Sequence, residues 1–332
     1  MPKVSVLMPV YNAANYIGEA IESILSQTFS DWELIIVNDG STDNTEKKIL
    51  LFTDKRIRYY KNEENKGVTF SRQLMVEKSL GEYIAFLDSD DIALPGKLKI
   101  QVDFLDNNPQ YALCGTWGTI IDEEGRKIKN FNTSVEHDEI RCMLLFRNPF
   151  IQSSIMVRRA LLSEETYDTD FPIAEDYDLW CRLSLAYKMR NIPKHLIKHR
   201  LHPASITAAK QKERNLFIKN IFKRELVNLA IYANDEELDI HLALKNKNAV
   251  DIPDKEFFKQ LKPWLYKLGG ANQLCRVYNH DTFLATVCFS WLYGCAKRKS
   301  YFRMLSLPVS LNAKAFRKFI QMVVRTKNSP RV

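Results

Sequence analysis

The sequence lacks the glycine-rich signatures of the common nucleotide-binding folds. No G-x-G-x-x-G follows the first apolar run, residues 4–10, and no G-x-x-x-x-G-K-[ST] occurs anywhere. These absences disfavour hydride transfer with a dinucleotide and chemistry on a P-loop. The 6 cysteines show no C-x-x-C spacing, so neither a zinc site nor a disulfide framework is indicated.

Signals for export and for membrane spanning are also missing. No basic leader with a following apolar core precedes the first expected strand at Val4, so we expect a cytoplasmic protein with reduced thiols. The uncharged run Thr282–Ala296 would reach only about 22 Å as a helix, short of the ~30 Å hydrocarbon core. A buried core helix and an interfacial segment both fit this run.

Charge divides the chain of 332 residues into two parts. Residues 207–332 hold 23 Lys/Arg against 10 Asp/Glu, a net charge of +13, whereas residues 1–206 hold 25 against 30, a net of −5, which together give +8. Length allows one large domain with an appendage. We therefore predict a first domain over 1–206 and a basic, mainly helical region over 207–332, which would meet an anionic membrane or nucleic acid.

Apolar runs of strand length alternate with helical segments in the first ninety residues or so. Residues 17, 21, 24 and 25 are apolar at helical spacing, and further helices are expected near Thr45 and around Arg72. This alternation predicts an α/β fold with a mostly parallel sheet covered on both faces. The expected strands are Val4–Val10, Glu33–Val37, Ile57–Tyr60 and Tyr83–Leu87.

The expected strands end in polar clusters. Tyr11 and Asn12 follow the first strand, Asp39 follows the second, and Asp88-Ser89-Asp90-Asp91 follows the fourth. Parallel strands bring such ends together, so we expect them to line one pocket. Grouped carboxylates suit a hard divalent cation that keeps positions open for substrate phosphates. The alternative is an acidic loop that caps the next helix, and we expect Asp91 to cap the helix after residues 94–96.

Four ordered motifs carry a family resemblance. They are VSVLMPVYNAANYIGEAIESILSQTFSDWELIIVNDGSTDNT, NKGVTFSRQ, GEYIAFLDSDD and EDYDLWCRL. Together they resemble the family 2 glycosyltransferases of the bacterial envelope-glycan type, over roughly residues 3–206. The resemblance implies the nucleotide-diphospho-sugar transferase fold, GT-A, and inverting sugar transfer.

The resemblance assigns the donor site. It implies that Pro9 and Tyr11 flank the base of a nucleotide-diphospho-sugar, a UDP-sugar by expectation. Asp39 would bond the base, and Arg72 would reach the nucleotide. The chemistry agrees, because an aromatic ring offers a stacking face and a carboxylate accepts the N–H of a uracil-like ring. The alternative for Tyr11 is that its ring packs on its own sheet. The alternative for Arg72 is that it is an ordinary helix-surface residue.

The resemblance also assigns a metal site to the D-x-D pair. Asp90 would ligate Mn²⁺ or Mg²⁺ directly, and Asp88 would lie near the ribose and the water shell of the metal. The cation would neutralise charge on the departing diphosphate. His202, in a His/Ser segment similar to the one that ends this domain in many relatives, would complete the metal or diphosphate site, or else be structural. Gln152 stands where many relatives have histidine.

A second chemical site begins at Glu175 and Asp176. Apolar residues 179, 183 and 186 predict a helix from here to about residue 187. Their spacing puts Asp176 on the inward face and lets Asp178 pair outward with Arg182. The resemblance makes Asp176 the base that deprotonates the acceptor hydroxyl, with Glu175 orienting it or the acceptor. The alternative is that these acids only complement the helix dipole.

The basic tail ends in an amphipathic segment, Lys314–Arg325. Residues 316, 319, 320, 323 and 324 form an apolar stripe between lysines and arginines, a pattern typical of binding to an anionic membrane surface. We therefore expect peripheral attachment at the inner face of the cell membrane. Packing on the protein itself is the alternative. Nucleic acid is disfavoured because no recognition motif accompanies the charge.

The sequence thus predicts a metal-dependent hexosyl- or N-acetylhexosaminyltransferase acting on a glycan or lipid-linked glycan acceptor. A sugar nucleotidyltransferase is disfavoured because the first loop has no glycine-rich, basic triphosphate motif. A subunit that binds nucleotide sugar without turnover is disfavoured by the acids at Asp90 and Asp176. No pattern in the sequence indicates an oligomeric state.

Overall fold

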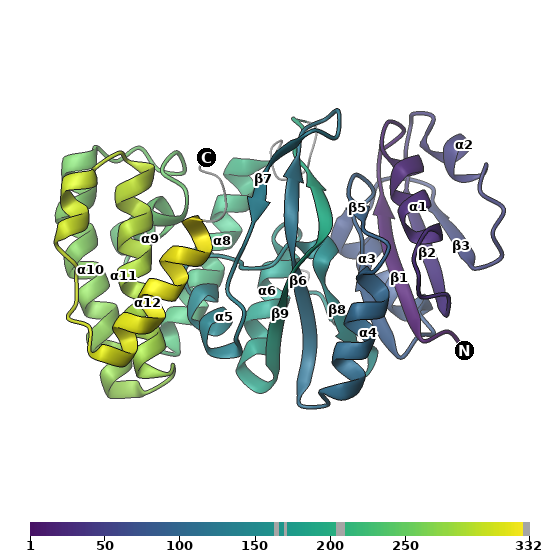
Figure 1. The fold of residues 1–332 in the computed structure, drawn as a ribbon. Coiled ribbons are helices and arrows are strands. Elements are labelled where there is room, and N and C mark those ends of the chain that lie inside the picture. Colours follow the sequence, from purple (N-terminus) through teal and green to yellow (C-terminus); the bar gives the residue numbers. More distant parts are fainter. Residues whose placement is uncertain (163–165, 169–170, 204–209, 328–332) are drawn as a thin grey trace. The chain divides into compact units, whose positions relative to one another are not determined.

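The structure is a computed structural model that describes residues 1–162, 166–168, 171–203 and 210–327 (Figure 1). These residues form two compact units, one of 1–135 and 150–203 and the other of 136–149 and 210–327. The predicted division between 206 and 207 lies outside the described residues. Residues 136–149, which the sequence interpretation kept with 1–206, belong to the second unit.

A mixed sheet organises the first unit. In the described residues it has nine strands in the order β3-β2-β1-β4-β8-β6-β9-β5, with β7 paired to β6. The strands are β1 (Val4–Val10), β2 (Trp32–Asp39), β3 (Ile57–Asn62), β4 (Tyr83–Phe86), β5 (Ile92–Ala93), β6 (Tyr111–Ile121), β7 (Lys127–Phe131), β8 (Met156–Arg158) and β9 (Lys188–Arg200).

The four N-terminal strands are parallel, as predicted, and their ends lie side by side. β1 pairs with β2 and β4, and β2 pairs with β3. The register sets Val10 beside Asn38 and Asp39 beside Asn62. β2 is buried along its whole length, as expected for a strand covered on both faces. The α/β fold class is confirmed, while β8 runs antiparallel to both β4 and β6, a reversal that apolar runs alone do not reveal.

Helices of both units follow in chain order (Figure 1). The first unit contains α1 (Ile17–Leu25), α2 (Thr45–Ile49), α3 (Val68–Lys78), α4 (Lys97–Asn107), η1 (Gln152–Ser154), η2 (Arg159–Leu161) and α6 (Glu175–Ala186). The second contains α5 (His137–Leu144), α8 (Gln211–Val227), α9 (Asp235–Lys245), α10 (Asp254–Cys275), α11 (His280–Lys297), η3 (Tyr301–Leu305) and α12 (Ala313–Lys327).

Helix α11 forms the core of the second unit. It contacts α5, α9, α10 and α12, and its side chains Phe283, Val287 and Trp291 are buried. The uncharged run 282–296 is therefore a core helix, one of the two alternatives that its length left open. Within the described part of the chain, no helix is long and apolar enough to cross a membrane.

Helix α12 divides the predicted apolar stripe between two environments. Phe319 and Met322 are buried in a cluster with Ala285 and Cys288 of α11. Phe316, Ile320 and Val324 are 50%, 41% and 52% exposed. The helix thus packs on the protein through one edge of the stripe and leaves the other edge in solvent. A five-residue stripe is wider than the contact with a single neighbouring helix, which explains the division.

A buried histidine connects segment 136–149 to the rest of the second unit. The indole N–H of Trp264 donates to His241 Nδ1 at 2.9 Å, and His241 Nε2 donates to the carbonyl of Leu145 at 2.7 Å. Because Nδ1 accepts a hydrogen bond, the ring is neutral in this arrangement. Burial lowers the pKa of His241 to about 4.

This histidine predicts a stability loss in mild acid. The folded-state pKa lies below the unfolded value of about 6.5, so the stabilisation is complete above about pH 6.5 and is lost as the pH falls towards about 4. The full loss is on the order of 3 kcal/mol. Denaturant unfolding at stepped pH measures it. In His241→Gln, which keeps one donor and one acceptor, the slope between about pH 6.5 and 5 should shrink; an equal slope in both proteins would contradict the assignment.

Candidate active site

The loop after β2 is anchored by Asp39. Its carboxylate accepts hydrogen bonds from Asn62 Nδ2 at 2.7 Å, from the Lys66 amide at 3.0 Å and from the Gly67 amide at 2.8 Å. Gly40 has φ +69°, and a Cβ there would come within 2.5 Å of the Glu64 backbone, so only glycine allows this crossing. Asp39 therefore holds the loop before α3 against the end of β2. Its contact with a base stays a prediction.

The loop after β1 is tied to the loop after β2. The Asn12 amide donates to Ser41 Oγ at 2.9 Å, and Asn12 Oδ1 accepts from the Thr42 amide at 2.9 Å. Pro9 is half-buried in β1, while Tyr11 is 47% exposed. The ring of Tyr11 thus keeps an accessible face, which a nucleotide base requires for stacking.

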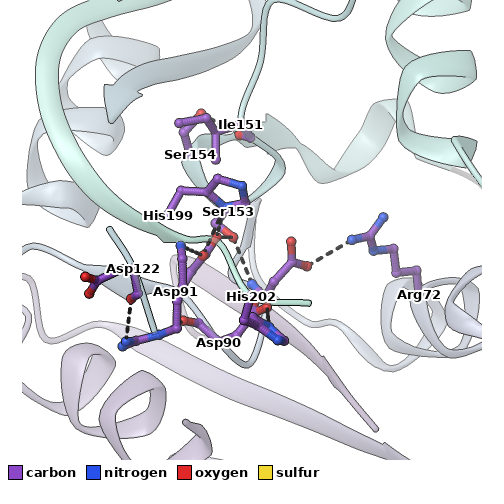
Figure 2. Close-up of polar contacts among 11 residues, drawn as sticks. Arg72, Asp90, Asp91, Asp122, Ile151, Ser153, Ser154, His199 and His202 are labelled. Carbon is purple, nitrogen blue, oxygen red and sulfur yellow. Dashed lines mark hydrogen bonds and ion pairs between the residues drawn. The ribbon is translucent and has the colours of Figure 1, made fainter. Parts of the chain in front are cut away.

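A buried arginine joins three elements. Arg72 (Figure 2), on α3, donates through Nη2 to Asp88 Oδ1, after β4, at 2.9 Å. Its Nη1 donates to Glu175 Oε1, at the start of α6. Its side chain is 8% exposed. Burial raises the pKa of Asp88, with Arg72 acting in the opposite direction. Burial likewise raises the pKa of Glu175 to about 7 against the effect of Arg72. Arg72 is therefore no ordinary helix-surface residue.

Asp90 pairs with His202. The distance from His202 Nε2 to Asp90 Oδ2 is 2.8 Å (Figure 2). This hydrogen bond raises the pKa of His202, and burial offsets part of the rise. The ring of Tyr16 lies 5.0 Å from the imidazole and carries the Arg200 guanidinium 4.7 Å from its centroid. The structure thus brings together two of the side chains that the sequence assigned to a metal.

Asp91 has a different role from the predicted helix cap. It is 1% exposed and accepts from the Arg200 amide at 2.9 Å, from His199 Nδ1 at 3.0 Å and from Ser153 Oγ (Figure 2). Ser153 Oγ also accepts from the Asp88 amide at 3.0 Å. The N-cap of α4 is Gly96, without a side-chain hydrogen bond. Asp91 instead attaches the acidic loop to the end of β9, a contact that sequence spacing cannot reveal.

The contact with Asp91 explains the raised pKa of His199, a residue for which the sequence predicted no role. Burial lowers the pKa of His199, but the hydrogen-bonded Asp91 outweighs burial and raises it to about 9. Arg200 donates to the carbonyls of Asp90 and Glu123 at 3.0 and 2.7 Å. The only signal in the sequence was that His199 and Arg200 begin the His/Ser segment, which is residues 199–205.

At the start of α6, the side chain of Asp178 has a different orientation from the one predicted. Asp178 is completely buried and accepts from Arg182 Nε at 2.8 Å, whereas Asp176 is half-buried. Asp178 was predicted to point outward. The spacing argument failed because Tyr177, Trp180 and most of their neighbours along α6 are buried too, so this helix has little outward surface. The partial exposure of Asp176 leaves it the more accessible acid.

Gln152 and Tyr167 are among the polar side chains of the described residues that are buried without a hydrogen-bond partner. Gln152, in η1, is 8% exposed, and both its side-chain oxygen and nitrogen lack a partner. The hydroxyl of Tyr167 is also unpartnered at 4% exposure. Arg72 and Glu175 both influence the Tyr167 pKa, which burial raises. Native proteins seldom leave such groups unsatisfied, so a ligand or water contact is expected here.

The fit to a divalent cation rests on few ligands. No group of three His, Cys, Asp or Glu side chains converges on one point among the described residues. Asp90 and His202 form a pair at 2.8 Å, and Asp88 is engaged by Arg72. Mg²⁺ commonly binds to one or two carboxylates and takes its other ligands from substrate phosphates and water. The pair fits a cation of this kind, bound together with a diphosphate.

Comparison with known proteins agrees with this geometry. Residues 5–165 match the family described as Glycosyl transferase family 2. An uncharacterized glycosyltransferase of Haemophilus influenzae is 35% identical over 72% of this chain and 77% of its own. An Escherichia coli protein, UDP-Glc:alpha-D-GlcNAc-diphosphoundecaprenol beta-1,3-glucosyltransferase WfgD, is 33% identical over 63% of this chain and 81% of its own.

Solved structures support the same fold. The crystal structure of S. aureus TarS 1–349 in complex with UDP-GlcNAc superposes with a TM-score of 0.57, covering 91% of this chain and 89% of TarS 1–349 at 20% identity. Identity this low supports only the fold. The sequence relatives carry the assignment further, since the chain covers more than two thirds of each of them at over 30% identity. The chain belongs to glycosyl transferase family 2 and is a glycosyltransferase.

Proposed function

We propose that this glycosyltransferase transfers a sugar, with inversion, from a UDP-sugar to a hydroxyl of a glycan or lipid-linked glycan. The observation that carries the proposal is the meeting of Arg72 on α3, Asp88 in the loop after β4 and Glu175 at the start of α6. The names of one sequence relative and one solved structure support a UDP-sugar as the donor. The E. coli relative uses UDP-Glc and a GlcNAc-diphosphoundecaprenol acceptor by its name, and the TarS structure contains UDP-GlcNAc.

The donor site in this proposal consists of the strand-end residues. Tyr11 stacks on the uracil with Pro9 beside it, and Asp39 lies at the edge of the base. Asp39 already accepts three hydrogen bonds from the protein, so its position is fixed before the donor arrives. Asp88 lies towards the ribose and is oriented by Arg72 at 2.9 Å. Prior fixation of these groups reduces the entropy lost on donor binding.

Asp90 and His202 are the residues that would hold Mn²⁺ or Mg²⁺. When bound, the cation supplies positive charge that stabilises the departing diphosphate. His202 offers a second donor to such a site because its Nε2 faces the Asp90 carboxylate at 2.8 Å. Asp91 supports the pair indirectly by fixing the loop to the Arg200 amide at 2.9 Å.

Asp176 is the base in this proposal. It removes the proton from the acceptor hydroxyl while the hydroxyl oxygen bonds to the anomeric carbon and the bond from that carbon to the diphosphate oxygen breaks. One displacement on the face opposite the leaving group inverts the carbon. Glu175 acts through Arg72, whose guanidinium it contacts, and is therefore a positioning residue. The half-burial of Asp176 leaves it accessible to the acceptor.

The proposal places the enzyme at a membrane surface, where a lipid-linked acceptor would lie. Its support is the net charge of +13 over residues 207–332 together with the exposed edge of α12 at Phe316, Ile320 and Val324. Basic residues beside exposed apolar side chains favour anionic lipid. Deletion of residues 300–332 would not test membrane binding cleanly. Phe319 and Met322 of α12 pack on α11, so the deletion would also remove part of the core of the second unit.

A turnover assay tests the proposed function. Purified protein is incubated with Mn²⁺ and with UDP-Glc or UDP-GlcNAc, with and without a GlcNAc-diphospho-lipid acceptor, and released UDP is measured. We expect acceptor-dependent UDP release and a heavier lipid product by mass spectrometry. UDP-sugar binding without UDP release under every condition would favour a binding subunit. In a parallel incubation with UTP and a sugar 1-phosphate, release of pyrophosphate would favour a nucleotidyltransferase.

A further inference from the structure

A cavity of about 610 Å³ opens where η3 packs on α10 and α11. Three of its lining residues are cationic, Lys262, Lys299 and Arg303, and no Asp or Glu lines it. The floor includes the aromatic side chains of Phe258 and Trp291. A concave site with positive charge and no carboxylate is suited to an anionic group such as a phosphate.

The three cations have no acidic partner among the described residues. Lys262 Nζ donates to Ser306 Oγ at 2.9 Å, and the Arg303 guanidinium lies 4.9 Å from the centroid of the Phe258 ring. All three residues are exposed. Elsewhere in the second unit, cations such as Arg298 and Arg325 pair with Asp254 and Glu139. The positive charge of these three side chains is thus not compensated by an acidic side chain among the described residues, and a ligand can reach it.

The same turn holds apolar side chains in solvent. Phe302 and Leu305, which form the tip of η3, are 86% and 84% exposed. Tyr301, the first residue of η3, is 61% exposed. The turn itself is held in place, because the Trp291 indole N–H donates to the carbonyl of Arg303 at 3.1 Å. Clustered exposed apolar side chains mark surfaces that meet another apolar phase or partner.

Lys299 occupies a backbone position that favours glycine. Its φ is +54°, and it follows α11, where its amide donates to the Ala296 carbonyl at 3.1 Å and the Ser300 amide donates to the Cys295 carbonyl at 2.8 Å. This pair of hydrogen bonds is a helix C-terminal motif in which the left-handed residue is usually glycine. A lysine here keeps a cation at the cavity despite an unfavourable conformation.

We propose that this cavity and the tip of η3 form a docking site for an anionic membrane. Phe302 and Leu305 insert among the acyl chains, and Lys262, Lys299 and Arg303 hold the phosphate of an anionic phospholipid. The combination selects a lipid surface over a soluble anion, because a soluble anion gives Phe302 and Leu305 nothing to bury against. This inference rests on the membrane location given under the proposed function and adds a second group of contact residues to the exposed edge of α12.

Lys299→Gly tests the charge without loss of folding, since glycine adopts positive φ freely. Flotation is measured with phosphatidylcholine vesicles with and without phosphatidylglycerol. We expect the substitution to weaken binding to the anionic vesicles about fivefold, with unchanged thermal unfolding. Lys247→Gly, which removes the same charge from an exposed turn of the second unit, is the matched control and should bind like the original protein. Equal weakening in both would mean that only net charge matters and would overturn the proposal.

Phe302→Ser combined with Leu305→Ser tests the apolar tip. We expect at least a roughly tenfold loss of vesicle binding, whereas Leu274→Ser, at an equally exposed leucine (85%), should have no effect. UDP release in solution should be unchanged in all variants. Strong flotation of the original protein with undiminished flotation of the tip variant overturns this site alone. No flotation of the original protein overturns both the site and the membrane location, without affecting the proposed transfer reaction.

Discussion

Asp176→Asn is expected to lower kcat by about 10²–10⁴ while the Kd of the UDP-sugar changes little, because asparagine keeps the shape of the side chain but cannot take the acceptor proton. Turnover is measured as UDP release with saturating acceptor, and donor affinity by calorimetry. A rise in donor Kd as steep as the fall in turnover would assign Asp176 to the binding site instead.

Glu175→Gln is the neighbouring control for this experiment. Glu175 contacts the buried guanidinium of Arg72, which also holds Asp88 at 2.9 Å. Removing its charge should disturb the orientation of Arg72 and Asp88, and therefore raise the donor Kd more than Asp176→Asn does. If Glu175→Gln instead lost turnover at unchanged donor affinity while Asp176→Asn stayed active, the base would be Glu175. Its pKa, raised by burial to about 7, would suit that role.

Chelation by EDTA and the substitution Asp90→Ala are both expected to abolish transfer, and Mn²⁺ or Mg²⁺ should restore the chelated protein only. Two unit charges about 4 Å apart interact by roughly 4 kcal/mol at an effective dielectric near 20. Loss of the cation beside the diphosphate should therefore reduce the rate on the order of 10³-fold. UDP binding by calorimetry, with and without metal, gives a readout that is independent of turnover.

His202→Gln distinguishes a metal ligand from a structural histidine. If His202 helps Asp90 hold the cation, the variant should need a higher metal concentration for half-maximal activity and should approach normal turnover at saturation. A variant that needs no more metal, but unfolds at lower denaturant concentration, would make the 2.8 Å contact with Asp90 structural. Full activity of the unmodified protein in EDTA would remove the metal from the mechanism altogether.

Local patterns in the sequence determined the elements that carry the site. Val4–Val10 was predicted with the bounds that the structure has, and the helix from Ile17 to Leu25 follows its apolar spacing. These predictions succeed because strands buried on both faces are continuous apolar runs, and because polar residues directly after them mark the strand ends. The fold class and the convergence of Asp39 and Asp88 on one edge of the sheet follow from this alternation.

Tertiary structure alone decided how those elements are joined. Asp91 binds the amide of Arg200, a residue 109 positions away, and segment 136–149 joins the second unit partly through the bond from His241 to Leu145. Asp178 lies fully buried where spacing predicted an outward face. Periodicity states which residues share a face of a helix, but burial of that face depends on what packs against it. Phe319 and Phe316 of α12 therefore have opposite environments, because Phe319 is buried against Ala285 and Cys288 of α11 while Phe316 is half exposed.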